Sequence, residues 1–340
     1  MKSALEVRDF RLETDCDCAK LVSFAPPERM LLKTVTRTQG TTQALKDGIV
    51  KPRGFAFDFE DVPILIHAFR RMVRGLEFDV SEMAITTYLC ARAHGTRFTA
   101  LPIFLVRAFH HGAIVYNAKA GIRVPKDLEG RKVGVNRGYT VTTGLWARSV
   151  LQQEHDVDLS RITWVLSGDE HVAEYQPPAN VVSIEPGKTI GQMLCAGELA
   201  AAIGVKVEHT DVKPFFPNAL EAGLAALRQR AHYPINHLIV VKDDLLDTHP
   251  DLAADIFDAF GESKRRYLER LTANAIDAPS AADRLHRAVM GITGDPLPYG
   301  IEPNRVVLQE LIDHALTQGI ITSRVSPEEL FPSSARGLVA

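Results

Sequence analysis

One carboxylate and two imidazoles lie at positions from which they could do chemistry together. Glu82 comes at the carboxyl end of a predicted buried strand, and His111 and His237 belong to two segments that each cross between predicted halves of the chain. Because segments that cross between the same two halves lie close in space, both histidines could meet at Glu82. Such a set could transfer protons as general acid and base. It could also hold a divalent ion, since imidazole and carboxylate suit Zn, Fe or Mn.

Each of these residues also has a purely structural interpretation. The carboxylate of Glu82 could simply accept hydrogen bonds from the backbone N–H groups at a helix N-terminus. A lone histidine is more often structural than catalytic. Adjacent residues of an extended chain point to opposite sides, so only one of His110 and His111 should face a ligand. No HExxH-type spacing supports a metal site. Whether Glu82, His111 and His237 meet therefore depends on how the fold brings distant parts of the chain together.

A second candidate is the segment 134–140, which predicts a strand, a glycine turn and the start of a helix. It lacks the full GxGxxG pattern, and no acidic residue stands at the ribose-binding offset, which argues against a dinucleotide site. The helix N-terminus, the Arg137 guanidinium and the hydroxyls of Thr140, Thr142 and Thr143 favour an anion instead, and we expect a carboxylate. A solvated turn is the alternative interpretation.

Alternating strand and helix patterns must position these residues. An early helix is predicted over 64–75 and others over 140–154 and 190–196, and from about residue 250 the chain is mainly helical. This alternation predicts an α/β fold with mainly parallel sheets and a C-terminal helical region. Strands are predicted at 31–36, 54–59, 78–83, 99–106, 162–166, 181–184, 199–205 and 238–241, with one more ending near 136, and a different unit is expected to begin at 113–117.

The order of these elements predicts two lobes. Residues 111–231 should form an α/β lobe inserted between the two parts of one outer lobe, 1–110 plus 232–340. Two crossover segments would then join the lobes, with a cleft between them. In open α/β sheets ligands bind beyond the carboxyl ends of strands, so the candidate residues should face this cleft.

Composition excludes several classes of protein. Thirty-nine Lys and Arg against 42 Asp and Glu give a net charge of −3, which argues against nucleic acid as the main partner. No apolar run approaches the ~20 residues needed to cross a membrane. The first residues carry acids and no apolar segment, so we expect no secretory signal and a cytoplasmic protein. We expect the basic run 264–266 to be solvated surface, and reduced thiols at Cys16, Cys18, Cys90 and Cys195.

Several strings, in order and over residues 31–333, together resemble the 4,5-dihydroxyphthalate decarboxylase family. The most specific are Ser-Glu-Met at 81–83 and Asp-Pro-Leu-Pro-Tyr-Gly at 295–300. The Asp-Leu-Glu-Gly string at 127–130 is common to many two-lobed binding proteins. Further matches lie at 187–190, 233–237, 318–321 and 329–331.

This resemblance implies a two-lobed fold similar to type 2 periplasmic binding proteins and decarboxylation of an aromatic diacid, 4,5-dihydroxyphthalate, to protocatechuate. It implies that Glu82, His111 and His237 lie in the cleft and that Arg148 lies near the anion site. The chain departs from the family pattern at 39–42, 110–112 and 200, which leaves a related aromatic or heteroaromatic acid as an alternative substrate. The residues expected to bind substrate are Thr41, Thr42, Arg107, Arg137, Tyr139, Thr140 and Arg148.

Loss of CO₂ from a hydroxylated ring needs a proton donor at the ring carbon, expected at Glu82 or His111, and a base or metal ligand at the phenol oxygen, expected at His237. Arg137 and Thr140 should anchor the carboxylate. We expect no organic cofactor, a divalent metal as the one ion considered, a small aromatic acid as partner, and a homo-oligomer. The competing interpretation is a non-catalytic solute-binding protein or sensor for a small carboxylate, since fold alone does not decide function.

Overall fold

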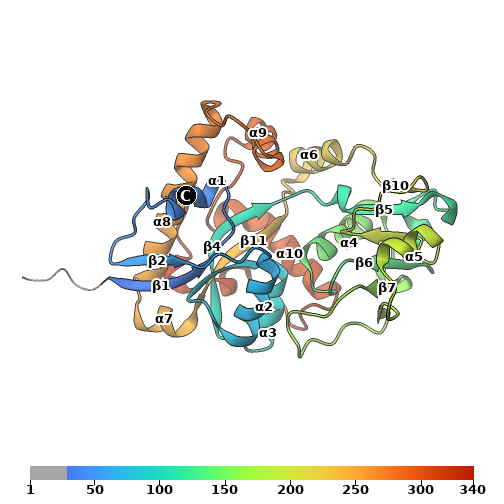
Figure 1. The fold of residues 1–340 in the computed structure, drawn as a ribbon, viewed down its shortest axis with the longest axis horizontal. Helices are drawn as coiled ribbons and strands as arrows, with labels where there is room; N and C mark the ends of the chain where they lie inside the picture. The colour runs from blue at the N-terminus through green and yellow to red at the C-terminus, as the bar shows by residue number, and fades with distance from the viewer. Residues whose placement is uncertain (1–28) are drawn as a thin grey trace, which may run out of the picture.

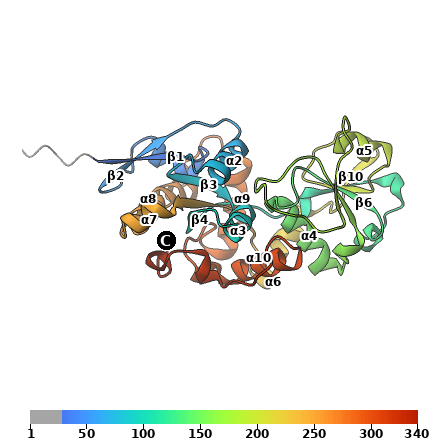
Figure 2. The same cartoon turned by 90° about the horizontal axis from the view of Figure 1, so that it is seen from below.

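The computed structural model describes residues 29–340, which form two halves side by side, each built on its own β-sheet (Figures 1 and 2). Cys16 and Cys18 lie outside the described residues. Cys90 and Cys195 are free thiols. Both sheets are covered by helices, as expected of an α/β fold.

The first half contains a five-stranded sheet in the order β2-β1-β3-β11-β4. β1 is parallel to β2 and β3, whereas β11 is antiparallel to both of its neighbours. The strands are β1 (Met30–Val35), β2 (Phe55–Phe59), β3 (Val80–Ala84), β4 (Phe98–Arg107) and β11 (Ile235–Lys242). The helices are α1 (Gly40–Lys46), α2 (Leu65–Gly75), α3 (Ile85–Ala93), α7 (Asp243–Thr248), α8 (Leu252–Thr272), α9 (Ala281–Thr293) and α10 (Arg305–Thr317).

The second half contains a six-stranded sheet in the order β10-β5-β9-β6-β7-β8. All its strands come from within the segment 111–231 that the sequence predicts to be inserted. The strands are β5 (Ile114–Asn117), β6 (Lys132–Val135), β7 (Thr163–Leu166), β8 (Val181–Ser183), β9 (Ala201–Ile203) and β10 (Val212–Pro214). The helices are α4 (Thr142–His155), α5 (Ile190–Ala196) and α6 (Ala219–Arg230).

The sheets are mixed, with a small majority of parallel pairings. Of the nine strand pairings in residues 29–340, five are parallel. The antiparallel pairings involve two strands. β11 belongs to the first half and follows the return of the chain from the second half, and β5 is the first strand of the second half. The strands next to the two crossovers therefore run against their neighbours, and the carboxyl ends of β1, β3, β6 and β7 remain together at the junction.

Large apolar side chains fill the interior of both halves, among them Trp146 and Trp164. The prediction of a solvated basic run at 264–266 is wrong for Lys264, whose ammonium is buried and donates to Asp295 and to the Leu297 carbonyl. It lies on the inner face of α8, where an unpaired charge would be costly. No helix within residues 29–340 is long and apolar enough to cross a lipid bilayer.

Candidate active site

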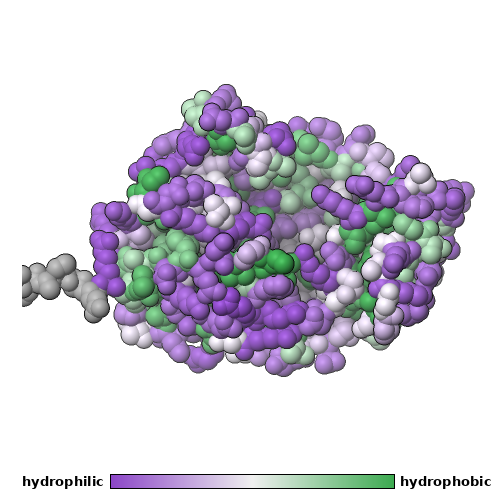
Figure 3. All heavy atoms as spheres, viewed as in Figure 1, coloured by the Kyte–Doolittle hydropathy of each residue, from purple (hydrophilic) through white to green (hydrophobic). Residues whose placement is uncertain are grey.

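A cavity of about 540 Å³ lies between the two halves, where the space-filling view shows a recess (Figure 3). The first half supplies residues after β1, from α2, from α3 and from the start of β11, and the second half supplies the turn after β6, the start of α4 and the loop after β7. Its volume suits a small organic ligand. The polar residues that line it are Thr36, Arg37, Thr38, Asp61, Thr87, Arg137, Thr142, Thr143, His171, Asn236 and His237.

A carboxylate and an imidazole meet at the edge of this cavity, as the sequence predicts. β11 pairs with β3 so that His237 lies opposite Ala84, and the Nδ1 atom of His237 is 2.6 Å from Oε1 of Glu82. Glu82 is fully buried behind His237 and also accepts hydrogen bonds from the backbone N–H and the Nε of Arg37, each 2.9 Å long. The pair lies at a strand end, as a ligand site in an open α/β sheet requires.

The protonation of this pair follows from its contacts. Burial opposes the charge of Glu82, but the hydrogen bond from His237 and the positive charge of Arg37 bring its pKa below the ordinary value. The Nη2 atom of Arg37 also lies 3.1 Å from Nδ1 of His237, and a guanidinium can only donate. The contact of Nδ1 with Glu82 is shorter, at 2.6 Å, and an ionised carboxylate can only accept, so we assign the hydrogen to Nδ1, which donates it to Glu82. Burial lowers the pKa of His237, and Glu82 offsets only part of this effect. At neutral pH the Nε2 atom therefore has a free lone pair, and it has no hydrogen-bond partner within residues 29–340.

The opposite wall of the cavity favours an anion. The side chain of Arg137 is exposed to the cavity and pairs with no carboxylate among the described residues. Val141, Thr142 and Thr143 line the cavity at the start of α4, and the first N–H groups of a helix have no acceptor within the helix. A guanidinium and a helix N-terminus together provide a site for a carboxylate.

His171 is a cavity residue that the sequence analysis missed. It lies in the loop after β7, is 6% exposed, and has its Nδ1 atom 3.5 Å from the Thr87 hydroxyl. Burial, together with nearby arginines, lowers its pKa to about 4. Arg37 was also missed. The local signal for Arg37 was its position directly after the predicted strand 31–36, whereas His171 lies five residues beyond the predicted strand 162–166 and carried no such signal.

The prediction that His111 joins Glu82 and His237 is wrong. His111 is buried at the crossover, where its Nε2 atom lies 2.8 Å from Glu154 on α4. Glu154 also pairs with Arg230, and Arg230 with Glu310 on α10. Glu310 in turn contacts His232 on the second crossover. His111 and His232 thus belong to a charge network away from the cavity lining, and His110 is buried against Asn236, at 3.1 Å. Of the four crossover histidines, His237 is the one that lines the cavity.

The anion cradle predicted at Tyr139 and Thr140 exists, but the protein fills it with its own carboxylate. Glu170 accepts hydrogen bonds from the backbone N–H groups of both residues and from the Thr140 hydroxyl. Gly138 leaves room for this carboxylate, because a Cβ atom there would collide with it. The ligand-binding interpretation of Tyr139 and Thr140 is therefore wrong, while that of Arg137 remains a prediction.

Four further residues predicted to bind substrate lie outside the cavity lining. The Thr42 hydroxyl donates to the Arg37 carbonyl beside the start of α1, and the Thr41 hydroxyl accepts from Gln39. Arg107 is buried and donates to the Tyr233 carbonyl and to Asn304. Arg148 is buried, donates to the Tyr139 carbonyl and to Gln318, and stacks on the Tyr139 ring. Their polar groups hold the fold together.

The predicted metal set does not fit this geometry. Within residues 29–340 no three His, Cys, Asp or Glu side chains are grouped so that they could hold an ion. His111 lies with Glu154, and the carboxylate of Glu82 is occupied by Arg37 and His237. We therefore derive no step through a metal from these residues.

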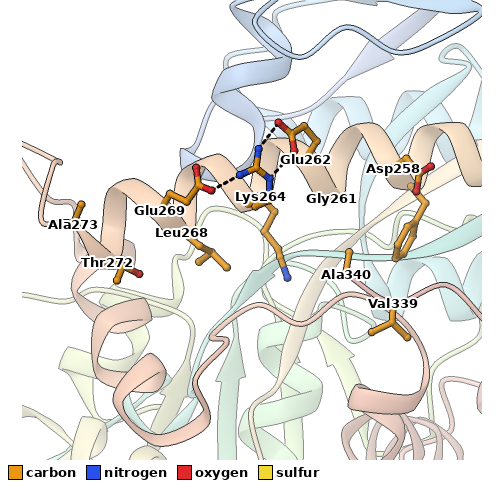
Figure 4. A pocket seen from close by; sticks show the side chains of 12 residues that line it. Asp258, Gly261, Glu262, Lys264, Leu268, Glu269, Thr272, Ala273, Val339 and Ala340 are labelled. Carbon is orange, nitrogen blue, oxygen red and sulfur yellow. Dashed lines mark hydrogen bonds and ion pairs between the residues drawn. The ribbon is translucent and has the colours of Figure 1, made fainter.

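A larger cavity, of about 800 Å³, runs along α8 beside the last residues of the chain (Figure 4). Arg265 in its lining binds both Glu262 and Glu269, while the exposed carboxylate of Asp258 forms no ion pair among the described residues. Lys264 is directed to Asp295 and Leu297. Its lining comes from α8, the residue after it and the last two residues of the chain, and it contains no histidine or cysteine. The cavity between the halves holds two histidines and is the better candidate.

The chain is similar in sequence to named enzymes. It is 30% identical over 280 residues to 4,5-dihydroxyphthalate decarboxylase from Comamonas testosteroni, a match that spans 77% of this chain and 84% of the relative. The chain belongs to the 4,5-dihydroxyphthalate decarboxylase family. It is also 33% identical over 144 residues to a protein of the same name from Pseudomonas putida, across 40% of this chain and 55% of that relative. No protein-family model matches the chain.

Solved structures of low sequence identity show the fold of this family member. The aliphatic sulphonate-binding protein SsuA from Escherichia coli has a TM-score of 0.51 at 11% identity and covers 91% of this chain and 93% of its own. The desulfurization enzyme DszB has a TM-score of 0.51 at 13% identity and covers 90% and 98%. A Candida albicans protein described as having the generic periplasmic binding protein fold has a TM-score of 0.51 at 11% identity and covers 88% and 92%. The predicted two-lobed fold is confirmed.

Proposed function

We propose that this protein decarboxylates a hydroxylated aromatic diacid, 4,5-dihydroxyphthalate or a close analogue. Removing one carboxyl group from that compound gives protocatechuate. The proposal is supported by family membership and by one feature of the cavity, the open Nε2 of His237 on one wall with the unpaired Arg137 on the other.

The chemistry requires groups at two places on the ring. Direct loss of CO₂ would leave an unstabilised aryl anion. A hydroxyl para to the leaving carboxylate avoids this, because electron density from its deprotonated oxygen makes the ring carbon basic enough to accept a proton. A base must therefore lie at the hydroxyl, and a cationic anchor must orient the acid groups.

His237 is the base in this proposal. Its Nε2 takes the hydroxyl proton, and the imidazolium formed is stabilised by the Glu82 carboxylate at Nδ1. Glu82 itself is a positioning residue, since it is fully buried and does not line the cavity. It cannot be the proton donor that the sequence predicts, because its contacts hold it in the ionised form.

Arg137 and the start of α4 anchor the carboxylates. The guanidinium offers paired N–H donors, which match a carboxylate geometrically. Phe69, Leu65 and Ile66 of α2 supply an apolar surface for the ring. Because the wall is shared between two halves, closure around the ligand would exclude water from the reacting atoms.

The decisive experiment measures CO₂ release from 4,5-dihydroxyphthalate and from a panel of hydroxylated aromatic acids. His237→Gln should lower turnover about 10²–10⁴-fold, whereas His249→Gln, at an exposed site after α7, should behave as wild type. Ligand-induced thermal stabilisation checks that the variants still bind. Tight binding by the wild type without CO₂ release from any acid would favour the solute-binding alternative and refute the proposal.

A further inference from the structure

The loop after β7 is attached to both halves of the molecule. Asp169 forms ion pairs with Arg70 at 2.8 Å and Arg74 at 3.5 Å, both on α2 of the first half. Arg74 also donates to the backbone carbonyls of Glu170 and His171, at 2.9 and 3.1 Å. The Glu170 carboxylate meanwhile binds the turn before α4 in the second half. These contacts fix the backbone from Asp169 to His171.

The imidazole of His171 is held against the cavity but is poorly satisfied. Its ring lies 6.2 Å from the ring of Phe69, which is also 5.2 Å from the ring of His237. Its Nδ1 makes one long contact, with Thr87, and its Nε2 has no hydrogen-bond partner within residues 29–340. Two imidazoles from different halves therefore flank the same phenyl ring in one cavity.

The proposed reaction needs a second proton-transfer group besides His237. Decarboxylation of a carboxylate consumes one proton from outside the substrate, because the C–CO₂ bond is replaced by a C–H bond. His237 takes its proton from the hydroxyl and must return it there when the ring regains its aromatic state. It cannot supply the proton that remains on carbon.

We propose that His171 is the catalytic acid, which takes up a proton when an aromatic dianion binds and delivers it to the ring carbon that loses CO₂. This inference rests on the proposed function. In the step, the His171 N–H bond breaks and a C–H bond forms at the para carbon. The C–CO₂ bond then breaks, its electron pair returns to the ring, and the phenolate oxygen recovers the proton held by His237.

The charges around His171 make this uptake depend on the ligand. Arg70 and Arg74 on α2 and Arg137 on the turn after β6 disfavour a cationic imidazole, and Asp169 on its own loop opposes them. The other side chains that contact His171, Thr87 of α3 and Phe69 of α2, carry no charge. Without ligand, burial and the arginines keep His171 neutral, with a pKa of about 4. Arg70 and Arg74 are already paired with Asp169 and do not line the cavity, so the ligand's carboxylates act at Arg137. They offset the repulsion from that guanidinium, and an opposite charge within a few ångströms raises the pKa of a histidine.

Proton uptake can be measured without turnover. Phthalate has both carboxylates but no hydroxyl, so it binds without being activated. Calorimetric titration of phthalate near neutral pH, in buffers that differ in ionisation enthalpy, gives the number of protons taken up. We expect about one proton for the wild type and for His237→Gln, and close to none for His171→Gln. The matched control is His67→Gln, an exposed position on α2.

Turnover supplies the second arm of the test. His171→Gln should lower CO₂ release from the hydroxylated diacid about 10²–10⁴-fold while its affinity for phthalate stays within about tenfold of wild type. Uptake of a proton by His171→Gln, or no uptake by the wild type, would overturn the inference. If uptake depends on His171 but no acid is decarboxylated, the proposed function fails while the ligand-linked protonation stands. If phthalate does not bind at all, both fail.

Discussion

Replacing Glu82 by glutamine tests the dyad most sharply, because the change preserves shape and reverses one hydrogen bond. Glu82 accepts three hydrogen bonds, from the backbone N–H of Arg37, from its Nε, and from Nδ1 of His237. A glutamine has one oxygen and one NH₂ group for these three donors. If the NH₂ group faces His237, then Nδ1 must accept, and the hydrogen moves to Nε2.

The size of the effect follows from this tautomer. A histidine with its hydrogen on Nε2 has no lone pair in the cavity and cannot take the hydroxyl proton. Forcing the wrong tautomer in a carboxylate–histidine pair costs about 10⁴ in kcat. Oε1 of Glu82 accepts from both His237 and the Nε of Arg37, and Oε2 accepts from the backbone N–H of Arg37. Either orientation of the amide therefore places its NH₂ group against one Arg37 donor, which costs about 1–3 kcal/mol, and in both orientations the imidazolium formed at His237 loses its carboxylate partner. We therefore expect Glu82→Gln to lower kcat about 10³–10⁴-fold.

The pH profile distinguishes this role from a structural one. His237 must be neutral to act, so wild-type activity should fall as the pH falls through its pKa. Glu82 raises that pKa, so its removal should shift the acid limb of the residual activity to lower pH. Glu82→Asp, which keeps the charge, should recover part of the rate, and Glu60→Gln removes a carboxylate outside the cavity as control. A Glu82→Gln enzyme within about threefold of wild type would refute the dyad.

Further predictions concern the anion wall, the internal carboxylate and the buried histidines. Arg137→Gln should weaken ligand binding about 10–100-fold, as loss of a hydrogen bond to a charged group implies, with no loss of thermal stability; Arg123→Gln, also exposed in the second half, should bind normally. Glu170→Gln should lower the free energy of unfolding by about 1–3 kcal/mol in denaturant titrations, because two backbone N–H groups lose a charged acceptor. Burial lowers the pKa of four histidines to about 4, namely His110, His171, His286 and His314. The unfolded chain binds protons that these folded histidines exclude, so the free energy of unfolding should fall between pH 6.5 and 4 and not between pH 8 and 7. Equal free energies of unfolding at pH 7 and pH 5 would contradict these lowered pKa values.

The sequence predicted the elements well where local pattern determines them. The predicted helix over 190–196 and most strands agree with the structure within a few residues. β10 was missed because three residues at a sheet edge carry no periodic signal, and the share of antiparallel pairing was underestimated. The direction of a strand beside a crossover depends on whether the chain is entering or leaving that half of the molecule. The path of the whole chain determines this, and no local pattern reveals it.

The dyad was predictable because topology alone brings its members together. A residue at the end of β3 and one at the start of the strand that returns from the second half must be neighbours if those strands pair, and they do. The content of the anion cradle was not predictable in this way. Glu170 comes from a loop some thirty positions later, and nothing in the spacing of the 134–140 segment reveals that a distant carboxylate will fill it.

The presence of a histidine on a crossover segment was not enough to distinguish a catalytic imidazole from a structural one. The environment of the second ring nitrogen makes this distinction. His111 and His237 each contact a glutamate through one nitrogen. The second nitrogen of His111 is buried without a partner in the described part of the chain, so no ligand can reach it. The second nitrogen of His237 lies at the cavity, as does that of His171. What gives an imidazole a chemical role here is a free nitrogen facing space large enough for a ring, and such space exists only once both halves of the chain are folded against each other.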